Sequence, residues 1–246
     1  MSAFKTMGLL LAGGALGVGF SPGAFAELAP GFDAALAAPQ RPAEERDRDA
    51  TRKPRQVLEF VGIGAGMTVL EVFAGRGWYT EVLSAAVGPD GRVYAQNAAR
   101  NAERYADSAR ARAARLGNIE VWNREIDDVG LSNEVAAAFT ALNFHDAVNR
   151  GGDEGALAFL GGVYGALEPG GVFGIIDHVG VAGQDNADLH RIEKERVRGL
   201  LVRAGFVVEA ESNVLANPAD DHTLSIRDES LGRNTDRLLF RARKPE

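Results

Sequence analysis

The sequence predicts an α/β fold, a seven-stranded and mostly parallel sheet with helices on both faces. Short apolar runs alternate with helix-like stretches across residues 42–246, and this alternation is typical of parallel strands joined by helices. The clearest unit lies at residues 69–87. Residues 69–73 resemble a buried strand, a turn of small residues follows at 74–77, and apolar residues then recur at helical spacing from Val82 to Val87.

Bulk composition sets limits on the class of protein. The 246 residues suffice for one domain with a large core, and 46% apolar and 25% charged residues are ordinary for a globular chain. The net charge of −7 disfavours nonspecific binding to nucleic acid, so no nucleic-acid partner is expected. The chain contains no cysteine, which excludes disulfides, thiolate metal sites and a cysteine nucleophile.

Residues 1–26 have the features of a secretory signal peptide. Lys5 precedes the 14 uncharged residues 7–20, and a Ser-Pro-Gly turn and an Ala-Phe-Ala site end the segment. We expect cleavage after Ala26, export to the periplasm or the exterior, and no stable membrane span afterwards, because a span needs about 20 apolar residues. The alternative is a mis-assigned start, with Met7 or a later codon beginning a cytoplasmic protein.

The remaining elements follow in order. Residues 27–41 are rich in Ala and Pro and are interpreted as a linker, and residues 42–62 as a leading helix beside the first strand. Further strands are expected at 92–96, 119–122, 135–144, 172–176, 206–210 and 238–242. Further helices are expected at 98–116, 154–167 and 187–204. An insert at about 217–235 precedes the last strand, and no turn is expected before His145.

The small-residue turn indicates a ligand site. Gly75 and Gly77 permit positive φ and carry no Cβ, so a ligand can lie against the backbone at the carboxyl end of the strand. The carboxylate of Glu71, close by, suits a ligand with a cationic group or free hydroxyls and would repel a pyrophosphate.

This segment, Glu71 to Gly77, resembles the first motif of class I S-adenosylmethionine-dependent methyltransferases, acid-x-Gly-x-Gly-x-Gly, with one glycine replaced by alanine. Residues 167–173 resemble the L-x-P-G-G turn before the fifth strand of that class, and the two motifs with the strand order cover residues 42–216. The resemblance implies a Rossmann-like, class I methyltransferase architecture and S-adenosyl-L-methionine as cofactor. The nicotinamide fingerprint G-x-G-x-x-G fits less well, because its third glycine would be Thr80.

The chain is more closely similar to a bacterial group of exported predicted methyltransferases of unassigned substrate. The matching stretches are residues 48–54, the glycine loop, and residues 142–146, 176–178, 217–221 and 235–237. They span nearly the whole chain after residue 26.

The resemblance also implies particular cofactor contacts. The amino-acid and ribose parts would be bordered by Glu71, Ala74, Gly75 and Gly77, with Tyr79 and Thr80 nearby. Class I enzymes usually place an acid for the ribose hydroxyls at the end of the second strand, where this chain has Gln96 and Asn97. An amide oxygen accepts hydrogen bonds without charge assistance. Asp127 or Asp128 would meet the adenine amino group, and Asn143 is counted among the cofactor contacts.

Two His-Asp pairs are the candidate catalytic groups. His145 and Asp146 follow the fourth strand, and Asp177 and His178 end the fifth, so both pairs are expected at the substrate-facing edge. His145 could take a proton from a substrate hydroxyl or amine, with Asp146 and His178 as the other candidates. A metal site of mixed ligands that included His190, or Asp220, Asp221 and His222, is the alternative, but the spacing matches no metal motif and no metal is predicted.

The sequence therefore predicts transfer of a methyl group to an oxygen or nitrogen of a small molecule. Two alternatives stay open at this point: an exported, non-catalytic binding protein on the same fold, and a nicotinamide-dependent oxidoreductase. The methyl acceptor and the oligomeric state are not predicted.

Overall fold

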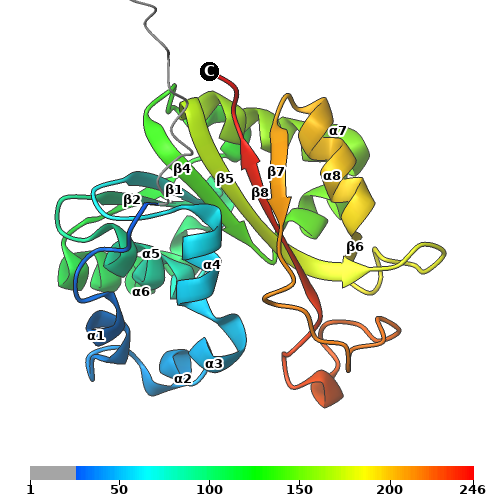
Figure 1. Cartoon of the computed structure of the whole chain (residues 1–246), viewed down its shortest axis with the longest axis horizontal. Coiled ribbons are helices and arrows are strands. Elements are labelled where there is room, and N and C mark those ends of the chain that lie inside the picture. The colour runs from blue at the N-terminus through cyan, green and yellow to red at the C-terminus, as the bar shows by residue number, and fades with distance from the viewer. Residues whose placement is uncertain (1–25) are drawn as a thin grey trace, which may run out of the picture.

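The computed structural model describes residues 26–246, and its centre is a mostly parallel sheet (Figure 1). The strand order is β3-β2-β1-β4-β5-β8-β7, with the short β6 paired to β5. β8 runs antiparallel to both β5 and β7. The predicted fold class is confirmed, with β6 as one additional strand.

The strands are β1 (Thr68–Val72), β2 (Arg92–Asn97), β3 (Ile119–Asn123), β4 (Val135–Ala141), β5 (Leu167–Gly180), β6 (Ile192–Glu193), β7 (Val207–Glu211) and β8 (Arg237–Arg243). The α-helices are α1 (Phe32–Ala37), α2 (Ala43–Arg46), α3 (Asp49–Arg52), α4 (Pro54–Val61), α5 (Trp78–Val87), α6 (Ala102–Leu116), α7 (Phe144–Ala166) and α8 (Lys194–Arg203). Short 3-10 turns are η1 (Ala99–Asn101), η2 (Ile126–Asp128) and η3 (Glu229–Leu231).

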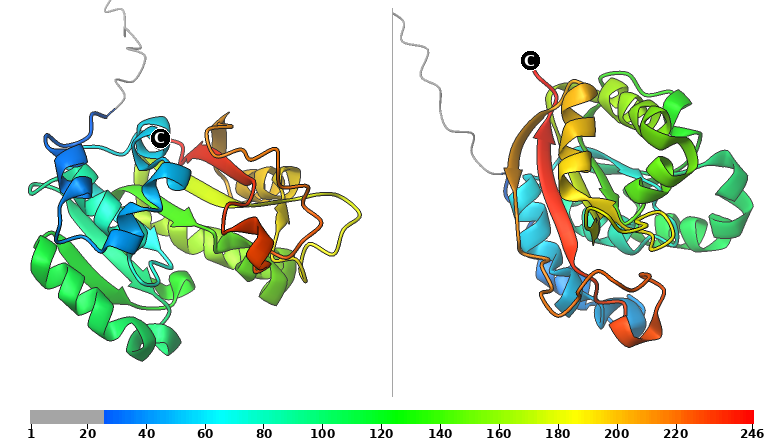
Figure 2. Two further views of the ribbon diagram at one scale, coloured as in Figure 1. Left: turned by 90° about the horizontal axis from the view of Figure 1, so that it is seen from below. Right: turned by 90° about the vertical axis from the view of Figure 1, so that its right-hand side faces the viewer.

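Helices cover both faces of the sheet (Figure 2). Alternate residues of a strand point to opposite faces, and β1 shows the consequence. Leu70 and Val72 join the core cluster that includes α7 and α8, while Val69 joins the cluster built with α1, α4 and α5. The central strands are buried on both sides, which is why they are continuous apolar runs in the sequence.

Residues 27–41 belong to the domain and do not form a linker. They contain α1, whose Phe32 and Leu36 are buried against the second core cluster. Arg41 is completely buried and donates to the Asp49 carboxylate at 2.8 Å. A helix of six residues is too short to show a clear period in the sequence.

The leading helix predicted at 42–62 is divided into α2, α3 and α4. The division before α4 lies at Lys53, which has a left-handed φ of 45° and directly precedes Pro54. A residue before proline is disfavoured in the helical region, so the chain turns here and α4 starts with proline in its first turn.

The strand predicted at 135–144 is shorter than expected, and a turn does precede His145. β4 ends at Ala141, Leu142 has a φ of 64°, and α7 begins at Phe144. His145 therefore lies in the first turn of a helix. This helix continues to Ala166 across a kink at Gly152.

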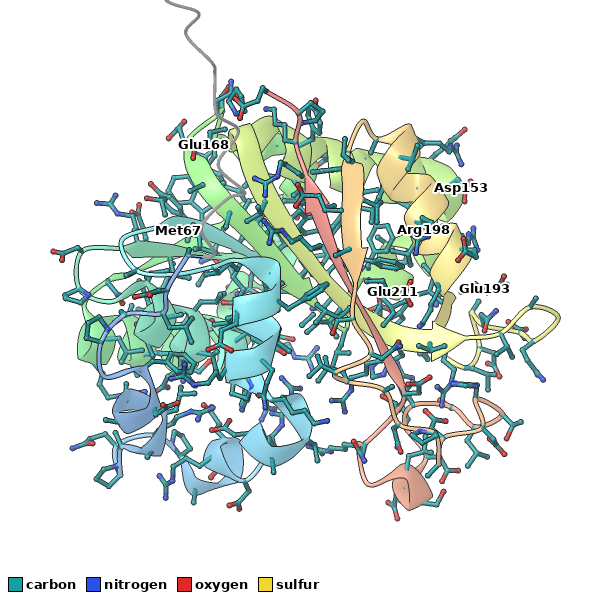
Figure 3. The ribbon with its side chains drawn as sticks, in the orientation of Figure 1. Met67, Asp153, Glu168, Glu193, Arg198 and Glu211 are labelled. Carbon is teal, nitrogen blue, oxygen red and sulfur yellow. The ribbon has the colours of Figure 1, made fainter. Side chains whose placement is uncertain are left out.

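The helix predicted at 187–204 begins later than expected. Residues 186–190 form turns, His190 has a φ of 54°, and α8 starts at Lys194 after the short β6. Arg198 of α8 donates to Glu211 of β7 at 2.8 Å, and this pair fixes the helix against the neighbouring strand (Figure 3).

The segment between β7 and β8 lies at the carboxyl edge of the parallel strands, on the same side of the sheet as α2 and α3 (Figures 1 and 2). The predicted signal peptide lies almost entirely outside the described residues. Among the helices of residues 26–246, none is long and apolar enough to cross a membrane.

Candidate active site

The loop between β1 and α5 offers open backbone at one glycine. Gly75 and Gly77 have φ values of 60° and 87°. A Cβ built on Gly75 would meet no atom closer than the Phe73 carbonyl oxygen at 3.9 Å. A Cβ on Gly77 would lie 2.7 Å from Nε of Arg112, so that side is covered. A ligand can therefore approach the main chain at Gly75, whereas Gly77 serves as the N-cap of α5.

The glycine missing from the methyltransferase motif is at position 73. Phe73 has a left-handed φ of 55°, a conformation that favours glycine. Its ring packs 5.5 Å from that of Phe159 on α7. Ala74, taken in the sequence for the replaced glycine, occupies a variable position of the motif instead. The core contact of the Phe73 ring offsets the strain of its backbone.

Gln96 and Asn97, at the end of β2, hold the backbone of the glycine loop by hydrogen bonds. Gln96 accepts a hydrogen bond from the backbone N–H of Phe73 at 2.9 Å, and Asn97 accepts one from Gly75 at 2.9 Å. Gln96 also donates to the carbonyl of Arg124 at 2.6 Å. A carboxylate could not make that last bond, because it has no donor. This gives a physical reason for an amide where related enzymes carry an acid, and contact of either residue with a ribose stays a prediction.

Glu71, Thr80 and Tyr79 lie behind the loop. Glu71 is 4% exposed and accepts a hydrogen bond from Oγ1 of Thr80 at 2.5 Å. Burial raises the pKa of Glu71 to about 7, against the opposing effects of Thr80 and Arg112. Tyr79 packs in the core, with its ring 4.7 Å from that of Phe139. These three residues shape the loop, and the structure does not place them on its open side.

Two other predicted cofactor residues remain accessible. Asp127 is exposed in η2, beyond the end of β3. Asn143 is half-buried, donates to the carbonyls of Ala141 at 2.7 Å and Phe73 at 3.3 Å, and so joins the end of β4 to the glycine loop. Ala74 and Gly75 are also half-buried, so each of these four residues is partly accessible.

An open cavity of about 910 Å³ lies between α2–α3, the ends of β4 and β5, and the segment before β8. Its lining includes Leu142 and His178 from the sheet edge, Arg52 from α3, and Arg237 from β8. His178 is thus the predicted catalytic residue that reaches this cavity. A molecule bound here would sit beside the end of β4, next to the glycine loop.

Three arginines converge on the cavity, and sequence reasoning did not assign them a role. Arg237 is 5% exposed and donates only to uncharged oxygens, those of Thr235, Thr51 and Arg233. Arg52 lies over the ring of Trp78, at 4.5 Å. Within residues 26–246, no carboxylate lies within ion-pair distance of Arg48, Arg52 or Arg237.

Burial lowers the pKa of all three arginines, that of Arg52 to about 10, and repulsion from neighbouring arginines adds to this effect. Carboxylates such as Asp49 and Asp220 act on them only from farther away. Burying a charge without a close partner is unfavourable, so the cavity is suited to an anion. The sequence contains a signal for this, since Arg48, Arg52 and Arg237 all fall in the stretches that carry the resemblance to the bacterial group.

One ring nitrogen of His178 is within hydrogen-bond distance of another side chain of the protein. Its Nδ1 lies 2.6 Å from Oγ1 of Thr235, and the residue is 7% exposed. Burial lowers the pKa of His178 to about 3, against the opposing Asp177 carboxylate, so the ring is neutral at neutral pH. A neutral imidazole can accept a hydrogen bond.

His145 pairs with Asp177, not with its sequence neighbour. Oδ1 of Asp177 lies 2.7 Å from Nδ1 of His145, and Oδ2 accepts from the His145 backbone N–H at 2.6 Å. The closest approach to Asp146 is 3.7 Å, from Nε2. Burial opposes protonation of His145, but the Asp177 carboxylate raises its pKa above the ordinary value. Neither His145 nor Asp146 lines the cavity, although the rings of His145 and His178 are 5.7 Å apart.

No protein-family model matches the chain, and no curated protein matches it in sequence. Solved structures do match. A S-adenosylmethionine-dependent methyltransferase from Aquifex aeolicus is 25% identical, with 80% of this chain and 93% of that one covered and a TM-score of 0.61. The [4+2]-cyclase SpnF is 18% identical over 80% of this chain and 81% of its own, with a TM-score of 0.59.

A third structure is described as a possible exported protein from Bordetella parapertussis. It is 16% identical over 81% of this chain and 68% of its own length, with a TM-score of 0.55. The similarity to SpnF and to the Bordetella parapertussis protein is a similarity of fold alone. The fold is that of class I S-adenosylmethionine-dependent methyltransferases, and the comparisons support an enzyme of that class with S-adenosylmethionine as its cofactor.

Proposed function

We propose that this protein transfers the methyl group of S-adenosylmethionine to an oxygen or nitrogen of a small, anionic acceptor. The observation that carries the proposal is the open main chain at Gly75, at the carboxyl end of β1, where sheets of this kind bind nucleotide-like ligands. The residues present fit such a cofactor, because the approach is free of side chains and the neighbouring groups are polar. When bound, the sulfonium supplies an activated methyl group, so the chain contributes mainly positioning.

On this proposal, the accessible residues around the loop hold the cofactor. Ala74, Gly75 and Asn143 border its amino-acid and ribose parts, and Asp127 meets the adenine amino group. Gln96 and Asn97 contribute by fixing the loop, through their bonds to the backbone of Phe73 and Gly75.

The cavity beside the end of β4 would hold the acceptor. A carboxylate or phosphate of the acceptor would bind Arg52 and Arg237, since a guanidinium pairs well with either group. His178, whose ring is neutral, would accept a hydrogen bond from the acceptor's O–H or N–H and orient it. The proton released on methylation would pass to solvent, because a pKa of about 3 makes this imidazole a weak base. His145 and Asp146, outside the lining, are not assigned to proton transfer.

Ligand-induced thermal stabilisation tests the proposal. Purified protein is heated with S-adenosylmethionine, with its demethylated product S-adenosylhomocysteine, or with NAD as the comparison ligand. A ligand present at 100 times its Kd stabilises a protein by about 2.7 kcal/mol, which should raise the melting temperature with the first two only. A folded protein that does not respond to millimolar amounts of either would overturn the proposal, and a response to NAD alone would favour the oxidoreductase.

A binding protein without turnover is the second candidate. It is favoured by Gln96 and Asn97, which replace the customary acid and already use their side-chain oxygens within the protein. Release of S-adenosylhomocysteine on incubation with a panel of carboxylated and phosphorylated metabolites separates the two. Ligand stabilisation without any release would favour the binding protein.

We also propose that residues 1–26 direct the protein out of the cytoplasm, because Lys5, the uncharged stretch that follows it and the Ala-Phe-Ala site have the order of a secretory signal peptide. A fusion of alkaline phosphatase after residue 40 should be active in a bacterial host. An inactive fusion that accumulates in the cytoplasm would support the later start and a cytoplasmic enzyme.

A further inference from the structure

His145, Asp146 and His190 form a compact group of potential metal ligands. It is the one group of three or more such side chains that lies close enough together in the described residues. Nε2 of His145 and Nδ1 of His190 lie 3.7 Å and 3.6 Å from Oδ1 of Asp146. One potential ligand atom from each of the three residues lies within 4.8 Å of the other two. The sequence offers a metal site that includes His190 only as an alternative and not as its prediction, because His190 follows His145 and Asp146 by more than forty residues and the spacing matches no metal motif.

These distances are too long for hydrogen bonds and suitable for coordination. A hydrogen bond between nitrogen and oxygen spans 2.7–3.2 Å. A tetrahedral ion with bonds of about 2.1 Å separates its ligand atoms by about 3.4 Å. The three atoms thus surround a space of the size that one metal ion fills.

The surroundings prepare His145 to act as a ligand. The buried carboxylate of Asp177 lies against Nδ1 of His145 and also accepts from the backbone N–H groups of His145 and His178, at 2.6 Å and 2.8 Å. This arrangement keeps the proton on Nδ1 and leaves the lone pair free on Nε2, the ring nitrogen that lies 3.7 Å from Asp146. A carboxylate behind a histidine is the usual support of metal-binding histidines.

His190 is held in place by its backbone. It has a left-handed φ of 54°, which is uncommon for histidine and costs conformational energy. The next residue, Arg191, is completely buried and forms two hydrogen bonds of 2.9 Å with the carboxylate of Asp220. The loop that carries His190 is therefore anchored, and the strained residue faces the first turn of α7.

We propose that His145, Asp146 and His190 bind a single divalent transition-metal ion of the zinc class, with Asp177 positioning His145. Two imidazoles and one carboxylate suit Zn²⁺, whereas Mg²⁺ prefers oxygen ligands alone. Three protein ligands leave a position for water or another small ligand. The ion would tie the first turn of α7 to the loop before β6, and the site does not depend on the proposed methyl transfer.

Titration calorimetry tests the site directly. The protein is freed of metal with a chelator and titrated with ZnCl₂ and, separately, with MgCl₂. We expect one Zn²⁺ per chain and no Mg²⁺ binding at the same concentrations. Zn²⁺ affinity should fall at least tenfold in His190→Ala, and about 10–100-fold in Asp177→Asn, which removes the support behind His145.

His222→Ala is the matched control. His222 is also a half-buried histidine beside a carboxylate, 2.9 Å from Asp236, but it lies outside the group. It should bind Zn²⁺ as the wild type does. Co²⁺ gives a second readout, since its visible absorption should appear in the wild type and in His222→Ala and be absent in His190→Ala.

Circular dichroism confirms that each variant is folded before titration. Absence of Zn²⁺ binding by the folded wild type would overturn the proposal. Equal affinities in the wild type and His190→Ala, or loss of binding in His222→Ala, would also overturn it, because the ion would then be held elsewhere.

Discussion

The side-chain oxygen of Asn97 accepts a hydrogen bond of 2.9 Å from the backbone N–H of Gly75. The bond joins the end of β2 to the one glycine of the loop that a ligand can approach. Gly75 is half-buried, so removing the Asn97 oxygen leaves the Gly75 N–H without its protein partner. We predict that Asn97→Ala costs about 0.5–1.5 kcal/mol of unfolding free energy, measured by urea denaturation, and weakens stabilisation by S-adenosylhomocysteine.

Asn97→Asp is the control for that prediction, because a carboxylate keeps an acceptor for the Gly75 N–H. It should retain the ligand response. If Asn97→Ala matches the wild type in both stability and ligand response, the bond has no part in shaping the site.

Gly75→Val should abolish stabilisation by S-adenosylmethionine. Valine would fill the open approach and would also be strained at a φ of 60°. Gly117→Val separates the two effects. Gly117 ends α6 with a φ of 80° and has equally open surroundings, but it precedes β3 at the opposite edge of the sheet. Both variants should melt at a lower temperature than the wild type, and stabilisation by S-adenosylmethionine should disappear only in Gly75→Val. If S-adenosylmethionine raises the melting temperature of Gly75→Val as it does that of the wild type, the cofactor binds elsewhere.

Glu71 should make the protein less stable as the pH rises. Its pKa is about 7 in the folded chain, against an ordinary value of 4.5 when unfolded. Between these values the unfolded chain loses the proton and the folded chain keeps it, so stability falls with increasing pH and the loss is complete above pH 7. Each unit of separation corresponds to about 1.4 kcal/mol.

Glu71→Gln should remove this part of the pH dependence, since glutamine does not titrate. Unfolding free energies from urea denaturation at pH 5, 6, 7 and 8 check it. The difference between variant and wild type should shift in favour of the variant as the pH rises. Parallel curves across this range would show that the folded chain does not hold the Glu71 proton.

The order of strands and helices could be predicted because buried parallel strands are continuous apolar runs bounded by glycine-rich turns. Left-handed residues other than glycine could not be predicted. Phe73 adopts that conformation because its ring packs on Phe159, and such a contact is invisible in the sequence. For the same reason the turn at Leu142 was missed, and His145 was placed at a strand end when it belongs to a helix.

The place of the candidate site residues along the strands could be predicted in part, and their pairing could not. The glycine loop follows β1 and His145 follows β4, as expected, but Asp177 and His178 lie within β5, which continues to Gly180. The partner of His145 is Asp177, however, because β4 and β5 are neighbours in the sheet. Arg237 donates to the carbonyl of Thr51, 186 residues away, and a contact between such distant segments depends on the whole fold.

The arginines of the cavity give the last prediction. Because Arg52 and Arg237 have no close carboxylate in the described chain, an anion bound between them should stabilise the protein. Sodium sulfate should raise the melting temperature more than sodium chloride of equal ionic strength, and Arg52→Met should lose most of the difference. Arg55→Met is the matched control, since the exposed Arg55 on the adjoining α4 is already paired with Asp33 and Glu59.

Equal sulfate effects in the wild type, Arg52→Met and Arg55→Met would show that no anion site exists in the cavity. Titration with S-adenosylhomocysteine then identifies which anion the arginines serve. If the arginines hold the acceptor, Arg52→Met should bind this product as the wild type does. A large loss of affinity would instead assign Arg52 to the carboxylate of the cofactor, and the acceptor would then need no negative charge.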